Sequence, residues 1–399
     1  MLRYADKVYD LKAQLQGISD SRLRPRIKTS AVVGNALAME LAQMGSLNAV
    51  SHTRGNCFWK KWITDGVLPS ADTIGRIFGL IEVNTIRSVL KHNYRRLKRN
   101  KALHPAFHDN LFALIIDGHE SSASYLSCCP DCLQREIKTA SGIKIQYYHR
   151  HVMAVLLCKD FVLLLDLEMQ LIGEDEVAAA VRLLERLFLE YPRAFDVVMA
   201  DGLYARAPFF KKITAHGKQV IAVLKDDRRD LLQDAMGIFG QEQPVFVQQG
   251  SSTRQLWDVE DLTSWPQFGK VRVIRSLETT TRKPQKTGKA EKHISDWMWV
   301  TTLPKKILGT EAFVVLAHKR WDIENKAFNE LVTYWHADHV YAHTRTAIEA
   351  FWLTTMLAYN LFHAFINLNL KPVIRAMYTK SFIASSIAAE LCMLKKRPP

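Results

Sequence analysis

The spacing of hydrophobic and polar positions divides the chain into a helical first quarter and a mixed remainder. Up to about residue 105, apolar residues recur with the period of a helix, most clearly in 35–44 and 73–81. This part lacks the apolar–polar alternation of strands. The pattern predicts an all-helical domain over residues 1–105.

Short apolar runs rich in β-branched and aromatic residues begin at residue 111. Five of them predict strands, at 111–116, 152–157, 161–165, 195–199 and 219–224. Between the third and fourth runs, residues 174–191 have an acidic start and one apolar face, which predicts a helix. This is the ribonuclease-H-like order of elements, in which the first and fourth strands lie side by side. We therefore expect an α/β fold with a mixed sheet.

The second half of the chain changes pattern twice. Residues 240–308 are rich in strand signals and contain a basic loop at 279–293, whereas a helical period returns near 310 and continues, with a break at 336–344, to 370. We expect an α/β core in two parts, 106–239 and 309–372, separated by a β-rich insertion at 240–308. A basic C-terminal tail follows at 373–399.

The apolar stretch 350–366 is the longest in the chain. It contains Asn360 and His363 and is short for a membrane span, so it predicts a buried helix and no membrane partner. The N-terminus has no apolar run typical of a signal peptide, and six cysteines are too few for a secreted disulfide framework. We expect a cytoplasmic protein.

Positive charge indicates the partner. The chain has a net charge of +14, and residues 1–105 hold 18 Lys or Arg against 7 Asp or Glu, which is +11 of that total. Basic proteins bind polyanions in part by releasing counterions, so a nucleic-acid partner is expected. The run 91–101 ends this part, and its candidate phosphate contacts are Arg95, Arg96, Lys98 and Arg99. A solvated helix face is the alternative interpretation of this run.

Three acidic residues are candidates for metal-dependent chemistry. Asp117 and Asp201 each follow an apolar strand and precede a glycine. An aspartate in that place is often only a turn residue, but two on neighbouring strands indicate a site for a hard divalent cation. Glu324 is the third, four residues after Arg320 on a predicted helix, where the pair lies on one face. A surface ion pair is the alternative for those two.

Together these segments resemble the catalytic motifs of bacterial insertion-sequence DDE transposases. The matching segments are Ile-Ile-Asp117-Gly, Met-Ala-Asp201-Gly-Leu-Tyr and Arg320-Trp-x-Ile-Glu324. The resemblance implies a ribonuclease-H-like domain interrupted by a β-strand insertion before the glutamate. Members typically have a tyrosine three residues before the arginine and a lysine seven after the glutamate. Here those places hold Ala317 and Leu331, so Lys326 or Lys319 is expected to bind the DNA strand end in their stead.

The resemblance also implies a mechanism and partners. Two Mg²⁺ or Mn²⁺ ions held by Asp117, Asp201 and Glu324 would support cutting at the ends of a mobile element and transfer of the 3′ hydroxyl end to a target. The expected partners are double-stranded DNA, as terminal inverted repeats and as target, and a second copy of the chain in the DNA complex. Two alternatives stay open: a ribonuclease-H-like nuclease without strand transfer, and a DNA-binding regulator without catalysis.

Cysteines and histidines form a second constellation. Cys129 and Cys132 have the spacing of a zinc knuckle, and the histidine pair His149 and His151 follows 17 residues after Cys132, so these four residues are candidate ligands of a structural Zn²⁺. Cysteines that merely pack in a loop are the alternative. A further group of histidines, at 336, 339 and 343, is interpreted as a helix cap and linker.

Overall fold

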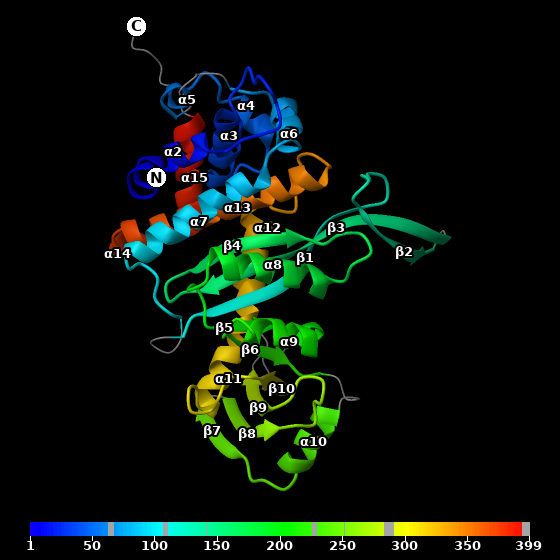
Figure 1. Ribbon diagram of the computed structural model, residues 1–399. Coiled ribbons are helices and arrows are strands. Elements are labelled where there is room, and N and C mark those ends of the chain that lie inside the picture. Colours follow the sequence, from blue (N-terminus) through cyan, green and yellow to red (C-terminus); the bar gives the residue numbers. More distant parts are fainter. Residues whose placement is uncertain are drawn as a thin grey trace. The chain divides into compact units, whose positions relative to one another are not determined.

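A computed structural model describes residues 1–62, 68–106, 111–140, 142–225, 230–250, 252–282 and 291–392 (Figure 1). The chain forms two compact units. The first comprises residues 1–106, 118–183 and 324–399, and the second comprises 107–117 and 184–323.

The N-terminal part of the first unit is helical, as predicted. Its helices are α1 (Leu2–Tyr9), α2 (Leu11–Gln16), α3 (Thr29–Leu41), α4 (Leu47–Ser51), α5 (Cys57–Trp62), α6 (Ala71–Phe78) and α7 (Val83–Arg99). The C-terminal helices α12 (Asn329–Trp335), α13 (Arg345–Ala364), α14 (Pro372–Met377) and α15 (Lys380–Cys392) belong to the same unit. The predicted tail is therefore helical up to Cys392, and residues 393–399 lie outside the described part.

Helix α13 forms the centre of this unit. It is buried from Ala347 to Ala364 and packs against α3, α7 and strand β4 (Val162–Met169). A helix with no polar face must be covered on all sides, and here protein does so. The predicted buried helix is confirmed, and no helix in the described part of the chain is long and apolar enough to cross a membrane.

Polar contacts fix α13 against its neighbours. The Asn360 side chain accepts from the backbone N–H of Leu164 at 2.9 Å and donates to its carbonyl oxygen at 2.8 Å, which satisfies both groups within the core. Arg87 on α7 pairs with Asp166 on β4 at 2.9 Å and with Glu349 on α13. Helix α7, strand β4 and helix α13 are thus joined by one buried ion triad.

The strands of the first unit include two features that the apolar pattern missed. Strand β1 (Ala113–Ser124) continues well beyond the predicted end at residue 116, and β2 (Leu133–Thr139) was not predicted. Strand β2 pairs with β3 (Gly142–Leu157), which in turn pairs with β4, both in antiparallel fashion. The C-terminal end of β1, the N-terminal end of β3 and the whole of β2 mix isolated apolar residues with polar ones, so they contain no continuous apolar run from which a strand is predicted.

The second unit contains the rest of the sheet. Its strand order is β1, β5 (Val197–Ala200), β6 (Gln219–Val223), β10 (Glu291–Thr301), β9 (Val271–Arg282), β8 (Ser252–Leu262) and β7 (Val245–Gln249). The first three are parallel, whereas β6 and β10 and all later pairs are antiparallel. The first and fourth predicted strands, β1 and β5, are neighbours, which confirms the expected ribonuclease-H-like arrangement. The predicted β-rich insertion continues this sheet from β6.

Helices and one buried ion pair complete the second unit. Helix α8 (Glu176–Glu190) passes into it from the first unit, α9 (Ala207–Thr214) packs on β6, α10 (Asp230–Phe239) on β8, and α11 (Thr310–His318) on β8 and β9. Arg272 and Asp258 form a buried pair at 2.7 Å between β9 and β8. Arg272 also donates to two backbone carbonyls, so its buried charge is well satisfied. Most of the predicted basic loop, residues 283–290, lies outside the described part.

Candidate active site

Asp117 lies on β1, and Asp201 directly follows β5, the parallel strand beside β1 in the second unit. The register of β1 and β5 pairs Ile115 with Met199, and continuing it by two residues brings Asp117 level with Asp201. Side chains at matching positions of neighbouring strands point to the same face. The two aspartates predicted from separate motifs are therefore brought together by the sheet.

Asp117 differs from the expectation in its local structure. It lies within β1 rather than at its end, since the strand continues to Ser124. Gly118 therefore does not serve a turn. A Cβ atom there would clash with the carboxylate of Glu176 at the start of α8, so the glycine makes room for that acidic side chain. Glu176 also pairs with Arg150 on β3 at 3.3 Å.

Asp201 lies where the sequence predicted it, directly after a strand and at the start of a turn. Its backbone is extended, it caps a short 3-10 turn at Gly202–Tyr204, and its carboxylate accepts from the backbone N–H of Leu203 at 2.8 Å. A Cβ on Gly202 would come within 3.2 Å of the Val223 carbonyl, so a glycine here lets the turn pack closely against the end of β6. The second carboxylate oxygen of Asp201 accepts no hydrogen bond given by the described residues.

Arg320 joins this group directly. Its guanidinium Nη1 donates to the Asp117 carboxylate at 3.1 Å, and its side chain is only 8% exposed. The guanidinium also lies 4.6 Å from the ring centroid of Trp321. The structure thus pairs this arginine with the first aspartate. The Arg320 guanidinium, with its parallel N–H donors, is also well suited to bind two oxygens of a phosphate.

Glu324 lies on an irregular helix, not on the regular one predicted. Residues Lys319–Trp321 form a 3-10 turn, and Ile323–Phe328 form a π-helix. The i, i+4 argument that placed Arg320 and Glu324 on one face assumed an α-helical period and does not apply to this mixture of turns. A π-helical turn inserts extra backbone into a helix and often occurs at functional sites. Glu324 is the first residue of the last segment of the first unit.

Comparison with known families decides the identity of the chain. The model of the transposase DDE domain matches residues 114–361, which include Asp117, Asp201, Arg320 and Glu324. The chain belongs to this family. Among curated proteins, none matches it. The protein is thus a transposase with a DDE domain, of a family that binds DNA and uses divalent metal ions.

The donor atoms at Asp117, Asp201 and Glu324 fit such ions. All three residues offer carboxylate oxygens, which Mg²⁺ and Mn²⁺ prefer over nitrogen or sulfur. Asp117 lies on β1 and Asp201 directly follows the adjacent strand β5, and the Asp117 carboxylate already has a cation, Arg320, at its oxygen.

The basic residues around Glu324 occupy different surroundings. Lys319 lies 3.9 Å from Asp322, a weak ion pair within the same turn. The Lys326 side chain is exposed, and its backbone carbonyl accepts from the Tyr359 hydroxyl at 2.6 Å, which anchors the π-helix to α13. Of the two lysines expected to bind the strand end, Lys326 is the more open to solvent.

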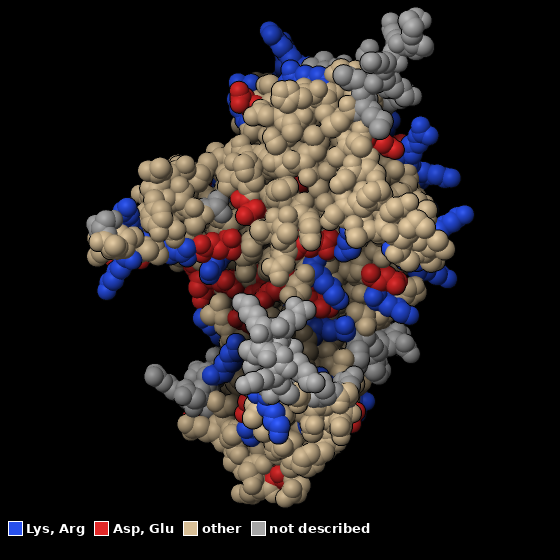
Figure 2. Space-filling model, turned by 180° about the vertical axis from the view of Figure 1, so that it is seen from behind, with Lys and Arg blue, Asp and Glu red and all other residues tan. Residues whose placement is uncertain are grey.

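The basic run of the transposase forms the last turns of α7. Arg95 and Arg99 are exposed, Lys98 reaches the Tyr94 hydroxyl at 3.1 Å, and Arg96 donates to the Val8 carbonyl at 2.8 Å. Arg96 therefore attaches α7 to α1, while its neighbours face solvent. Figure 2 shows basic side chains projecting singly around the edge of the helical part instead of covering it as one patch.

The structure changes the membership of the cysteine and histidine group. Cys129, Cys132 and His149 come together, but the fourth member is His343, which precedes α13. His151 is fully buried elsewhere, with its ring 4.4 Å from that of Trp352 and 5.5 Å from that of His119. His343 was noticed in the sequence but interpreted as part of a linker, because nothing in the spacing of the chain relates it to residue 132.

Proposed function

We propose that this transposase cuts DNA at the ends of its mobile element and joins the freed 3′ hydroxyl end to target DNA. Asp117, Asp201 and Glu324 would hold two divalent ions, Mg²⁺ or Mn²⁺. The observation that most supports this is the match to the DDE family together with two of its acids at neighbouring places of the sheet, one on β1 and one directly after the adjacent parallel strand β5. The substrates would be double-stranded DNA, as terminal inverted repeats and as target, and two copies of the chain would act in the DNA complex.

Divalent ions in such a site supply Lewis acidity and fix the attacking and leaving oxygens for an in-line displacement. The side chains of this protein have three further tasks. The aspartates are held by β1 and β5, whose backbone hydrogen bonds restrict them, so little ordering is needed when a metal binds. Arg320 would exchange Asp117 for a phosphate oxygen when DNA enters. The exposed arginines of α7 would contact the DNA backbone away from the reaction.

The test uses one isosteric substitution at each acid, Asp117→Asn, Asp201→Asn and Glu324→Gln. An amide keeps the shape but loses the charge that attracts a divalent ion. We expect each variant to lose Mg²⁺-dependent cleavage of a DNA carrying the element end and to keep its affinity for that DNA. Glu185→Gln, a half-exposed acid on α8 that pairs with Lys212, is the matched control and should cleave normally.

Two outcomes would redirect the proposal. A variant with near-normal cleavage removes that residue from the metal site. Wild-type protein that cleaves but never joins the 3′ end to a second DNA would be a nuclease without strand transfer, and protein that binds without cleaving would be a regulator.

A further inference from the structure

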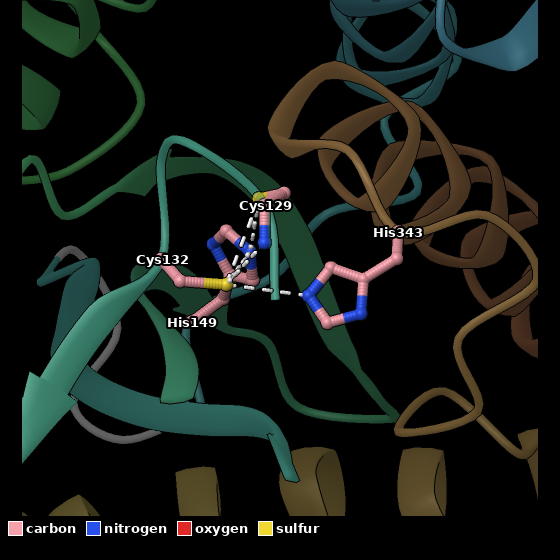
Figure 3. A group of neighbouring side chains, drawn as sticks. All are labelled: Cys129, Cys132, His149 and His343. Carbon is pink, nitrogen blue, oxygen red and sulfur yellow. Dashed lines mark hydrogen bonds between the residues drawn. The ribbon is translucent and has the colours of Figure 1, made fainter. Parts of the chain in front are cut away.

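Four side chains in the first unit converge on one point. Figure 3 shows Cys129, Cys132, His149 and His343 directed toward one another from three segments of the chain. The two cysteines lie in the turn between β1 and β2, His149 lies on β3, and His343 lies between α12 and α13. All four ligand atoms are within 4.8 Å of one another.

The distances match the edges of a metal-centred tetrahedron. The two Sγ atoms are 3.6 Å apart, His149 Nε2 is 3.3 Å from one and 3.4 Å from the other, and His343 Nε2 is 3.3 Å from Cys132 Sγ. Zinc bonds of about 2.3 Å to sulfur and about 2.0 Å to nitrogen give tetrahedral edges of roughly 3.3–3.8 Å. Four of the six donor–donor distances are therefore already those that one such ion needs, and the other two are within 4.8 Å.

The fold holds this arrangement in place. Strands β2 and β3 pair Leu133 with Tyr148, and continuing this antiparallel register by one residue brings Cys132 opposite His149. The turn before β2 is closed by the N–H of Cys132 donating to the Cys129 carbonyl at 3.1 Å. The N–H of Cys129 donates to Cys132 Sγ at 3.2 Å, a contact that stabilises negative charge on sulfur.

A disulfide and plain core packing both fit the cluster less well than a metal ion does. A disulfide needs sulfur atoms about 2.05 Å apart, and these two cysteines are free. Core packing does not account for four polar ligand atoms turned toward one centre, with Cys132 and His149 at 2% and 1% exposure. Two sulfur and two nitrogen donors in a tetrahedron suit zinc and not the oxygen-seeking ions of the proposed active site.

We propose that Cys129, Cys132, His149 and His343 bind one structural zinc ion. All four positions of the tetrahedron are filled by protein, so none is left for a substrate, and the ion has a structural role. It would tie the β1–β2 turn and β3 to the segment between α12 and α13. That segment follows α12, which in turn follows the π-helix of Glu324, so zinc would restrain the chain at the C-terminal end of α12. The inference is independent of the proposed strand-transfer chemistry, since no ligand is shared.

Metal analysis of the full-length protein tests the site. After dialysis against a mild chelator, we expect about one zinc per chain. Cys129→Ser and His343→Asn should each reduce zinc content to near zero. Each has a matched control in its own segment: Cys128→Ser, an exposed cysteine next to the first ligand, and His339→Asn, an exposed histidine near the last. Both controls should keep a full equivalent.

Cobalt gives a readout that does not depend on stability. Protein reconstituted with Co²⁺ should show the absorption of a tetrahedral thiolate site in wild type and in both controls, and should lose it in Cys129→Ser. Folded wild-type protein without zinc, or an oxidised Cys129–Cys132 pair, would overturn the proposal. Zinc retained in His343→Asn but lost in His151→Asn would return the fourth position to the histidine that the sequence first suggested.

Discussion

The acidic pair of the second unit and the cysteine and histidine cluster of the first unit are both candidate metal sites, but they are built differently. Asp117 and Asp201 come from two neighbouring strands, and one of them is neutralised by Arg320. The cluster comes from three segments, with Cys132 and His343 separated by 211 residues, and all four of its donor atoms lie within 4.8 Å of one another. A site for exchangeable ions needs charge and access, whereas a structural site needs closed geometry.

Crossed substitutions give the largest expected difference between the two sites. Asp201→Asn should lower cleavage on the order of a thousandfold, since losing metal-derived stabilisation costs several kcal/mol, and should leave zinc content unchanged. His343→Asn should instead remove the zinc and leave cleavage unchanged. A ligand present at a hundred times its Kd stabilises a fold by about 2.7 kcal/mol, so its loss lowers the unfolding temperature by roughly 5–10 °C.

Single-turnover cleavage, zinc analysis and thermal unfolding on the same preparations measure both effects. Equal loss of cleavage in the two variants, with no change in unfolding temperature for His343→Asn, would mean that the sites are not functionally distinct.

Removing the cation of the acidic pair should have the next largest effect. Arg320→Ala deprives both Asp117 and an incoming phosphate of a charged donor, worth about 2–3 kcal/mol, so cleavage should fall on the order of a hundredfold. The same change should tighten Mg²⁺ binding, because the ion no longer competes with a guanidinium. Arg275→Ala, which breaks an ion pair with the half-exposed Asp296, is the control. If Mg²⁺ titrations of cleavage give the same midpoint in Arg320→Ala and wild type, Arg320 does not compete with the metal.

A third carboxyl shows what burial does to an acid that has no cation. Burial raises the pKa of Glu40 on α3 to about 8, and a side-chain hydrogen bond with Thr355 offsets only part of this effect. Below the pKa of the unfolded chain, near 4.5, Glu40 is protonated in both the folded and the unfolded state, so its raised pKa does not change folding stability there. As pH rises from 4.5 to 8, only the unfolded chain releases the proton. Folding stability should then fall by up to about 1.4 kcal/mol, or tenfold, per pH unit.

Glu40→Gln should remove that slope. Chemical denaturation at pH 5, 6, 7 and 8 measures it, with Glu185→Gln as the exposed control. If the free energy of unfolding changes with pH in the same way in wild type and in Glu40→Gln, Glu40 is not protonated in the folded protein.

The smallest effect concerns the basic helix that serves neither metal site. Reversing the charges of Arg95 and Arg99 together should make the plot of log DNA affinity against log salt concentration less steep. Its slope should fall by about 0.9 for each phosphate that the helix no longer neutralises, and the unfolding temperature should not change. Arg96→Glu should instead lower the unfolding temperature, because Arg96 fastens α7 to the Val8 carbonyl of α1. If the slope against salt is unchanged in the Arg95 and Arg99 variant, this face of α7 does not contact DNA.

Much of the fold could be predicted from local patterns. The apolar runs and the helix at 174–191 led to β1 beside β5, and the apolar segment 350–366 led to the buried helix α13. Strand β2 and the polar ends of β1 and β3 were missed, because their hydrogen bonds, not an apolar face, define them as strands. The irregular turns around Glu324 were missed as well, since their sequence is compatible with a regular helix.

The sequence by itself determined the chemistry available to this protein: its acids beside glycines, its basic helix, its paired cysteines and its membership in the DDE family. Those features are local, because residue type and close spacing suffice to reveal them. Only the tertiary structure decided which partners meet. It placed Arg320 on Asp117, Glu176 against Gly118, and His343 instead of His151 beside Cys132. Each of these contacts joins segments far apart in the chain, and their distance depends on how whole strands and helices pack.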